Sequence, residues 1–389
     1  MKIDKSSPSH WLLLGLQGLY CLIAIALRPF TRKPDIPLVI LYGHQFSGNL
    51  KALYDQWLAT HRNRMSLQVL SLDPEHARSL EQDGIQVLRC NRLTDMLYLA
   101  RCSAMITDHG LHLMTPLLRF TDIRFIDVWH GIPFKGFVPE DFALQHRYDE
   151  VWVSSERLAQ LYREQFGFQD SQLKCLGYAR TDRLFRAAAG PQSPEADLAL
   201  PPGKYALYAP TWQQDEKGRE LFPFGESGES FISAIADTCA AHGATLLVRS
   251  HLNSEISQFS HPNVTFCSQR DYPDTEAILL QADILICDWS SIAFDYLALR
   301  RPMLFLDVPP PFKNGFSLDG SYRAGAVITG MECLRDSLGT FVDDPVEFAR
   351  RYAGLQDQTL AEIYQNQTQG AAARLQLDHL ARQLQRSNP

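Results

Sequence analysis

The chain has 389 residues, of which 45% are hydrophobic and 21% are charged, and its formal net charge is -7. This length suits two domains of roughly 150 to 200 residues, and the composition excludes a disordered chain and a polytopic membrane protein. The acidic balance argues against a broad basic surface, so we expect no nucleic-acid partner. The eight cysteines lie far apart and never as C-x-x-C, which is typical of reduced core residues rather than of disulfides or a zinc site.

A hydrophobic helix is the first predicted element. Residues 11–27, WLLLGLQGLYCLIAIAL, contain one strongly polar side chain, Gln17, and as a helix they would be ~26 Å long, just short of the ~30 Å hydrocarbon core. Three interpretations stay open: a membrane anchor or embedded helix, a signal peptide cleaved near Ala24 and Ala26, and a buried core helix. Basic residues after the run slightly favour a cytoplasmic body. We therefore expect residues 1–34 to hold the protein, anchored or peripheral, at the cytoplasmic face of the cell membrane.

Seven short apolar runs follow, each leading into loop residues and a helix-like stretch. Continuous β-branched runs that alternate with helical segments are typical of parallel sheets covered on both faces. They predict a first Rossmann-like domain over residues 35–190. The runs are residues 36–43, 67–72, 85–90, 104–108, 123–131, 150–155 and 173–178.

The alternation then restarts after residues 187–204, a stretch rich in Pro, Ala and Gly that has the composition of a linker. It predicts a second Rossmann-like domain over residues 204–345, followed by helices over 346–389 that could return to pack on the first domain. The fold class is therefore α/β, with two doubly wound domains and an N-terminal hydrophobic helix. The apolar runs of the second domain are residues 205–211, 244–251, 263–268, 283–288, 303–307 and 324–330.

Polar residues at strand ends are the candidate site residues, because ligands of open parallel sheets bind beyond the carboxyl ends of the strands. In VWHGIPFKG a strand runs into His130 and Gly131. A histidine titrates near neutral pH, as a general base must, and Gly131 lets the backbone approach a ligand. Lys135 offers a point charge for a phosphate. The same residues also suit a tight turn with a hydrogen-bonded histidine.

Two strand ends in the second domain carry further candidates. In YAPTWQ, Thr211 can cap a helix or bind an oxyanion. In LLVRSHLN, Arg249 and His251 are two residues apart on a strand, so both side chains can point at one anion. An arginine at a buried strand end also suits pairing with a structural carboxylate.

The stretch DILICDWSSIAFDYLALRR has the richest pattern. A buried strand ends at Asp288, and Ser290 and Ser291 open a predicted helix whose free N–H groups and dipole would bind a pyrophosphate. Asp295, about one turn into that helix, could reach a hydroxyl group. The structural alternative is that Asp288 or Ser290 only caps the helix and Asp295 only opposes its dipole. The chain has no H-E-x-x-H, G-x-x-x-x-G-K-[ST] or G-x-S-x-G motif.

Taken in order, DVWHGIPFKG, GYARTDRLF, YAPTW, RSH and the stretch from residue 283 to 307 resemble the CDP-glycerol glycerophosphotransferase family of teichoic acid and capsular polymer synthesis. The resemblance implies a GT-B arrangement, with an acceptor-side domain and a nucleotide-donor domain facing a cleft. It implies transfer of glycerol phosphate, or a related polyol phosphate, from a CDP-polyol donor to a hydroxyl of a lipid-linked or polymer acceptor, with release of CMP. It implies no dedicated metal and no cofactor.

The resemblance also assigns residues. His130 and His251 match the catalytic histidines, Ser290 and Ser291 match the serine pair at the donor phosphates, and GYARTD carries a matching Arg180 and Asp182. The full prediction is catalytic His130 and His251, with donor and phosphate contacts from Gly131, Lys135, Arg180, Thr211, Arg249, Asp288, Ser290, Ser291 and Asp295.

Several positions depart from the family pattern. Ile132 stands where threonine is usual and Gln213 where arginine is usual, Trp289 replaces a tyrosine, and residues 318–330 lack the usual R-G-x-x-x-D-Y segment. These changes leave the donor polyol open between glycerol, ribitol and others. Two alternatives also stay open: a GT-B glycosyltransferase that uses a UDP-sugar, and a membrane-tethered protein that binds a nucleotide without turnover.

Overall fold

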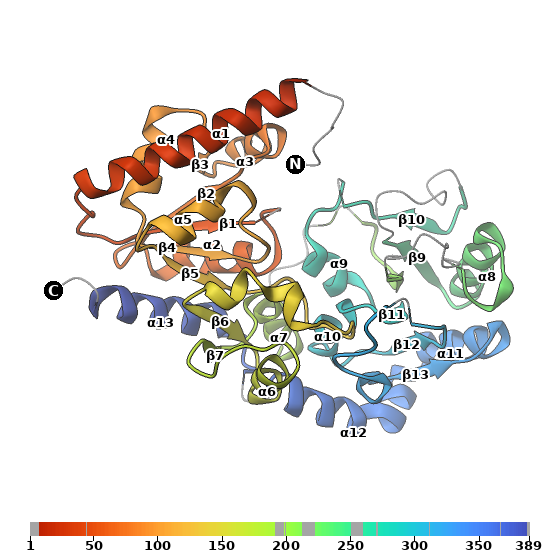
Figure 1. Ribbon diagram of the computed structural model, residues 1–389. Helices are drawn as coiled ribbons and strands as arrows, with labels where there is room; N and C mark the ends of the chain where they lie inside the picture. The colour runs from red at the N-terminus through yellow and green to blue at the C-terminus, as the bar shows by residue number, and fades with distance from the viewer. Residues whose placement is uncertain are drawn as a thin grey trace. The chain divides into compact units, whose positions relative to one another are not determined.

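The computed structural model describes residues 8–43, 45–190, 198, 200–211, 222–249, 260–269, 271–310, 312–365 and 367–386, and it confirms the α/β fold (Figure 1). Contacts divide the chain into two compact units. Unit 1 comprises residues 1–130, 139–180 and 371–389, and unit 2 comprises residues 131–138 and 181–370. The division differs from the predicted boundaries, because it falls after Arg180 rather than within 190–204 and assigns the segment that follows His130 to unit 2.

Unit 1 is built on a seven-stranded parallel sheet in the order β3-β2-β1-β4-β5-β6-β7. Every strand lies within or one residue from a predicted apolar run. The order reverses between β1 and β4, so the loops after these two strands flank a topological switch point. The strands are β1 (Leu38–Tyr42), β2 (Ser66–Leu70), β3 (Val87–Leu88), β4 (Ala104–Thr107), β5 (Arg124–Asp127), β6 (Glu150–Val153) and β7 (Leu173–Cys175). The helices are α1 (Pro8–Leu27), α2 (Gly48–Thr60), α3 (Pro74–Gln82), α4 (Leu93–Arg101), α5 (Thr115–Phe120), α6 (Glu156–Glu164) and α13 (Ala372–Arg386).

Unit 2 repeats this topology in a six-stranded parallel sheet, β10-β9-β8-β11-β12-β13, whose switch point lies between β8 and β11. The strands are β8 (Lys204–Tyr208), β9 (Ala244–Val248), β10 (Val264–Phe266), β11 (Ile284–Cys287), β12 (Met303–Leu306) and β13 (Ala326–Ile328). The helices are α7 (Asp182–Ala188), α8 (Gly228–Ala241), α9 (Thr275–Gln281), α10 (Ile292–Leu297), α11 (Met331–Asp343) and α12 (Pro345–Ile363).

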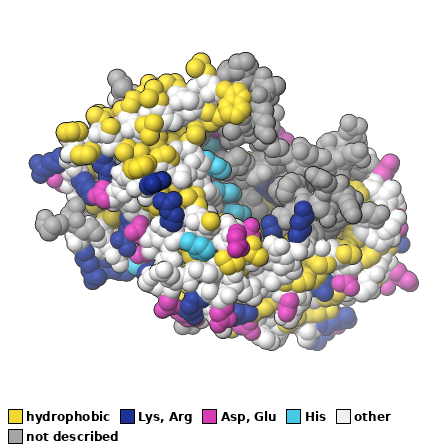
Figure 2. Space-filling model, viewed as in Figure 1, with side chains coloured by type: hydrophobic (Ala, Val, Ile, Leu, Met, Phe, Trp, Pro, Cys, Tyr) yellow, Lys and Arg dark blue, Asp and Glu magenta, His cyan; other side chains and the backbone are white. Residues whose placement is uncertain are grey.

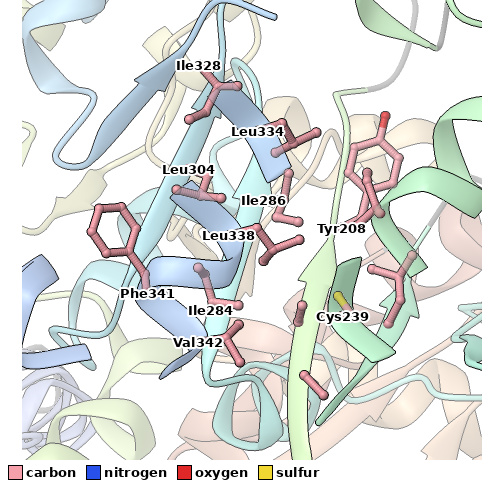
Figure 3. Packing of buried hydrophobic residues seen from close by; sticks show 14 of the residues in the cluster. Tyr208, Cys239, Ile284, Ile286, Leu304, Ile328, Leu334, Leu338, Phe341 and Val342 are labelled. Carbon is pink, nitrogen blue, oxygen red and sulfur yellow. The ribbon is translucent and has the colours of Figure 1, made fainter. Parts of the chain in front are cut away.

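The core of unit 2 shows why its helices cover the sheet as they do (Figure 3). Leu334, Leu338 and Phe341 recur on α11 at a spacing of four and three residues, which places them on one helix face. That face belongs to the same buried cluster as Ile284 and Leu304 from β11 and β12. The apolar face of α11 therefore packs against the apolar side chains of β11 and β12, and this contact fixes where the helix lies on the sheet.

The two C-terminal helices belong to different units. Helix α12 belongs to unit 2, where it buries Phe348 in the core cluster. Helix α13 belongs to unit 1, where it packs beside α2 and where His379 Nε2 lies 2.8 Å from Glu150 Oε2. Of the predicted segment 346–389, residues 371–389 are thus assigned to unit 1.

The N-terminal helix α1 is docked on unit 1 by one face only. It packs on α4 and α5, and Gln17 Nε2 donates a hydrogen bond to the carbonyl of Leu72 at 2.8 Å, while Cys21 and Ala24 are fully buried. Among the described residues it is the helix long and apolar enough to cross a membrane. Its opposite face is exposed, so the structure combines a docked helix with an apolar outer surface. The exposed residues are Trp11, Leu12, Leu16, Leu19 and Leu22.

A carboxyl group is buried at the end of β5. Asp127 is 0% exposed, and neither of its carboxyl oxygens has a hydrogen-bond partner within the described part of the chain. Burial, with a smaller effect of the Asp108 carboxylate, raises the pKa of Asp127 well above its usual value, and the nearby backbone N–H of Trp129, which falls outside full hydrogen-bond geometry, opposes the shift only in part. The folded protein therefore keeps the neutral carboxylic acid form of Asp127 to higher pH than an exposed aspartate does.

We expect Asp127→Asn to gain stability relative to the wild type as the pH rises. An unfolded aspartate titrates near pH ~3.9, so above that pH the folded wild type binds one more proton than the unfolded chain. Its free energy of unfolding then falls by up to ~1.4 kcal/mol per pH unit until the folded pKa is reached, and the amide has no such dependence. Urea unfolding at a series of pH values from about 4 to 7 measures the difference.

Asp83→Asn, which replaces an exposed carboxylate by the same amide, is the control for the substitution itself. A difference between Asp127→Asn and the wild type that stays constant with pH would contradict a protonated Asp127.

Candidate active site

Two histidines and an aspartate gather at the carboxyl edge of the unit 1 sheet. Asp108 and His109 follow β4 directly, and His130 follows β5, its parallel neighbour. Asp108 is buried, whereas His109 and His130 both reach solvent. These loops lie at the edge where ligands of doubly wound sheets bind, and β4 borders the switch point.

A single hydrogen bond fixes the tautomer of His130. Its Nδ1 lies 3.0 Å from the backbone carbonyl oxygen of Asp108. A carbonyl oxygen can only accept, so Nδ1 carries the proton and Nε2 carries the lone pair. The neutral ring is therefore oriented to accept a proton at Nε2.

The surroundings of His130 favour this neutral form. Although the residue reaches solvent, desolvation by the protein around its ring, with a smaller effect of His109, lowers the pKa of His130 to about 4, and the hydrogen bond to Asp108 opposes the shift. The imidazole is thus uncharged at neutral pH and needs no prior deprotonation to act as a base.

Asn49 clamps the backbone that carries His130. Its Nδ2 donates to the carbonyls of Val128 and Trp129, both at 2.9 Å, and its Oδ1 accepts from the backbone N–H of Arg180 at 3.0 Å. Arg180 Nη1 in turn donates to the carbonyl of His130 at 2.8 Å. The clamp holds Trp129 at a φ of 45°, a conformation that is rare for bulky residues and that concentrates at functional sites. The structure therefore brings two predicted site residues, His130 and Arg180, together.

The segment that follows His130 is fixed within unit 2. Phe134 is buried with its ring 4.6 Å from that of Phe294, and Lys135 forms an antiparallel bridge with Phe316. A Cβ on Gly136 would lie 2.2 Å from the carbonyl oxygen of Asn314, so this position requires glycine. The predicted phosphate ligand Lys135 places its Nζ 4.7 Å from the centre of the Phe137 ring.

Gly131 and Ser291 lie against each other in unit 2. A Cβ on Gly131 would lie 2.9 Å from Ser291 Oγ, which is too close for a larger residue without a shift of the serine. Gly131 and Ser291 come from two separate predicted motifs, and the structure places them in contact. Residues that bind the same ligand would have to lie this close together.

Thr211 and Asp288 meet across the switch point of unit 2, at the ends of β8 and β11. Thr211 donates its backbone N–H to Asp288 Oδ1 at 2.8 Å, and its hydroxyl donates to the same oxygen. Asp288 is 4% exposed. Its carboxylate therefore fixes the position of Thr211 at the end of β8.

The helix predicted from Ser290 to Arg301 is shorter than expected. Helix α10 spans Ile292–Leu297, with Ser291 as an N-cap whose side chain makes no capping hydrogen bond. The positive φ of 55° at Arg300 interrupts helical geometry before the predicted end. Asp295 is 1% exposed, so it is buried within unit 2. The predicted helix start at the two serines is confirmed, its predicted length is wrong, and the binding of phosphates by Ser290 and Ser291 stays a prediction.

Arg249 follows β9 and ties it to the start of α9. Its Nη1 donates to the carbonyl of Tyr272 and its Nη2 to Thr275 Oγ1, both at 2.9 Å. The predicted partner, His251, lies outside the described residues, as does Gln213. The shared anion site of Arg249 and His251 therefore stays a prediction. Asp182 is buried at the first position of α7.

Sequence reasoning missed three residues that build the unit 1 site: Asn49, Asp108 and His109. The strand run 104–108 gave a signal, because Asp108 and His109 are polar residues at a carboxyl end beside the strand that leads to His130. Asn49 gave little, since the partners of its side chain are backbone groups distant in sequence. Over the described ranges, no group of three or more His, Cys, Asp or Glu side chains is placed to hold a metal ion.

The sequence is similar to those of enzymes that synthesise teichoic acids. The chain is 26% identical to the teichoic acid ribitol-phosphate polymerase TarK of Staphylococcus aureus over 75% of this chain and 59% of TarK. It is 27% identical to the teichoic acid glycerol-phosphate primase of Bacillus subtilis over 74% of this chain and 78% of the primase. The chain spans about half the length of the ribitol-phosphate polymerases that it matches.

A structural comparison agrees with the fold. The wall teichoic acid polymerase TagF superposes with a TM-score of 0.72 over 97% of this chain and 95% of the TagF chain, at 17% sequence identity. That likeness shows the fold, which is the GT-B-like pairing of two parallel sheets predicted from the sequence. The family model for CDP-glycerol:poly(glycerophosphate) glycerophosphotransferases matches residues 21–308, and the chain therefore belongs to this family.

Proposed function

We propose that this chain transfers glycerol phosphate, or a related polyol phosphate, from a CDP-activated donor to a hydroxyl of a lipid-linked or polymer acceptor and releases CMP. The product would be a cell-envelope polymer, teichoic acid or capsule. Family membership supports the reaction class. The observation that carries the proposal is the orientation of His130. Its Nδ1 is bound to the carbonyl of Asp108, which leaves Nε2 to act as the base, and the Arg180 guanidinium donates to the His130 carbonyl. The names of the relatives include both glycerol and ribitol, so either polyol fits.

The reaction needs one bond to form and one to break at the β-phosphorus of the donor. The acceptor oxygen attacks this phosphorus, the bond to the bridging oxygen breaks, and CMP leaves. His130 Nε2 accepts the hydroxyl proton during the attack and returns it to solvent. Phosphoryl transfer is chiefly a problem of positioning and charge stabilisation, so the basic requirement is a correctly aimed base beside groups that hold the diphosphate.

We assign the donor to unit 2. The close contact of Gly131 with Ser291 and the loop fixed by Thr211 and Asp288 support a ligand at the carboxyl edge of its sheet. In this proposal Ser290 and Ser291 hydrogen-bond the phosphates, while Lys135, Arg249 and His251 supply positive charge. Thr211 donates both its N–H and its hydroxyl to Asp288, so its part is to hold Asp288 at the edge of the sheet. No dedicated metal or cofactor is part of the proposed reaction.

The proposal is tested by release of CMP from CDP-glycerol and CDP-ribitol by purified protein, with and without a lipid-linked acceptor, beside a UDP-sugar. We expect the acceptor to stimulate release of CMP. Turnover of the UDP-sugar with none of the CDP-polyols would instead support a glycosyltransferase, and binding of a CDP-polyol without turnover would support a nucleotide-binding protein.

His130→Ala should lower turnover by ~10² to 10⁴ and leave donor binding intact, because it removes the proton acceptor but no proposed donor contact. Steady-state CMP release gives the rate and calorimetric titration with CDP-polyol gives the affinity. His242→Ala, which changes a histidine paired with Asp343 on unit 2, is the control and should retain both. Wild-type turnover in His130→Ala would remove His130 from the base role.

We also propose that α1 places the protein at the cytoplasmic face of the cell membrane, where a lipid-linked acceptor would lie. Figure 2 shows hydrophobic side chains gathered over this helix. Its exposed leucines and Trp11 suit the apolar side of a membrane interface. Arg32, which follows the helix, is 92% exposed and pairs with the equally open Asp35 at 3.8 Å, so its guanidinium lies at the surface where anionic headgroups would be. Arg28 and Lys33 both pair with Asp122 and fix the end of the helix on unit 1.

Replacing Leu19 and Leu22 together by glutamate should reduce binding to phosphatidylglycerol-containing vesicles at least about tenfold, because burial of each leucine is worth ~1.5–3 kcal/mol. Both side chains are 54% exposed, so folding should persist. Vesicle flotation measures the bound fraction. Val346→Glu, which changes an apolar side chain that is 62% exposed on α12, is the control. Unchanged flotation of the double variant would show that α1 is not the membrane contact.

A further inference from the structure

A second imidazole lies flat against the proposed base. The rings of His109 and His130 stack with their centres 4.3 Å apart and their planes inclined by 9°. His109 comes from the loop after β4 and His130 from the loop after β5, so neighbouring strands of one parallel sheet present the two rings.

Asp108 holds both rings at once. Its side-chain Oδ1 lies 2.7 Å from His109 Nδ1, and its backbone carbonyl oxygen lies 3.0 Å from His130 Nδ1. Asp108 therefore hydrogen-bonds Nδ1 of both imidazole rings. Because the rings are nearly parallel and are both held at Nδ1, the orientation of one restricts the orientation of the other. The side chain of His109 is 36% exposed, which leaves it at the surface of the site rather than in the core.

We propose that His109 is the positioning residue of His130: its ring is the platform against which the base is aimed, and its charge adds to the effect of burial in keeping the base neutral. This inference rests on the proposed general-base role of His130. His109 lies outside the motifs that resemble the family, so the inference comes from the geometry of this chain.

The charged groups around His109 and His130 determine whether His109 favours or disfavours protonation of His130. The Asp108 carboxylate faces His109, the Arg180 guanidinium donates to the carbonyl of His130, and His112 lies three residues beyond His109. The buried carboxyl of Asp127 lies at the end of the neighbouring β5 and interacts electrostatically with Asp108. In this set His109 acts on His130 as a cation when it is protonated and disfavours a second charge on the stacked ring.

Two substitutions separate the platform from the charge. His109→Ala removes both and should lower kcat by roughly 10²-fold, because small misplacements of a catalytic group have effects of this size, while KM for the donor stays within about threefold. His109→Phe restores a flat ring but not the charge or the hydrogen bond to Asp108, so it should recover part of kcat through stacking alone. In the same Phe variant the protonation midpoint of His130 should move up by about one pH unit, because the neighbouring cation is gone.

The midpoint is measured on ligand-free protein by NMR titration of ¹³C-labelled histidine, with the His130 signal assigned by its loss in His130→Ala. This titration needs no donor, so it stays decisive even if the wild type turns over no CDP-polyol and the proposed function fails. His242→Phe is the control and should leave the His130 midpoint unchanged. If His109→Ala does not fold, the titration of His109→Phe decides alone.

Wild-type kcat in folded His109→Ala would overturn the platform. An unshifted His130 midpoint in His109→Phe would overturn the electrostatic part of the inference. Equal loss of kcat in the Ala and Phe variants, with no change in the titration, would mean that His109 only supports the local fold.

Discussion

The hydrogen bond from His130 Nδ1 to the carbonyl of Asp108 is the interaction on which the unit 1 site depends. It decides which ring nitrogen is basic, and it does so with a backbone acceptor that no side-chain substitution removes directly. The acceptor is itself fixed, because Asp108 follows a buried strand, β4, which is paired with both β1 and β5. The parallel sheet thus fixes the carbonyl of Asp108, and this carbonyl in turn fixes the orientation of the His130 ring.

The other contacts of the site protect this arrangement. Asn49 ties the two residues before His130 to the backbone of Arg180, and the Arg180 side chain returns to the His130 carbonyl. These bonds join segments far apart in sequence, so the loop is held by long-range contacts and not by local turn propensity. They also support the strained backbone at Trp129, whose positive φ would be unfavourable in an isolated loop.

The chain connects the proposed base to the proposed donor site by a single peptide bond. His130 ends unit 1, and Gly131, which lies against Ser291, begins the segment that belongs to unit 2. The motif VWHGIPFKG therefore contributes to both units: residues 128–130 belong to unit 1 and residues 131–136 belong to unit 2. Its first half owes its position to the sheet of unit 1, and its second half owes its position to Phe134 and the bridge at Lys135. A base and a phosphate-side glycine can be adjacent in sequence because each is fixed by a different core.

The sequence predicted the fold closely because the strands are continuous apolar runs, and burial on both faces leaves few other ways to place them. It also singled out polar residues at strand ends, among them Thr211 and Asp288, but it did not predict that these two hydrogen-bond to each other. It did not predict the domain boundary at Arg180, because the boundary depends on which core each short segment joins and not on linker composition. The length of α10 was wrong, since the positive φ at Arg300 has no clear signature in an apolar run. Asn49 was missed because it acts through backbone carbonyls, and His109 because its role depends on the register between β4 and β5.

The central claim is that phosphorus, and not sugar carbon, is the atom attacked. ³¹P NMR of a complete reaction with CDP-glycerol or CDP-ribitol and a lipid-linked acceptor tests it most directly. The account predicts loss of the two diphosphate signals and their replacement by equal amounts of a phosphomonoester, CMP, and a phosphodiester in the acceptor product. Release of CDP without a new phosphodiester, or turnover confined to a UDP-sugar, would contradict it.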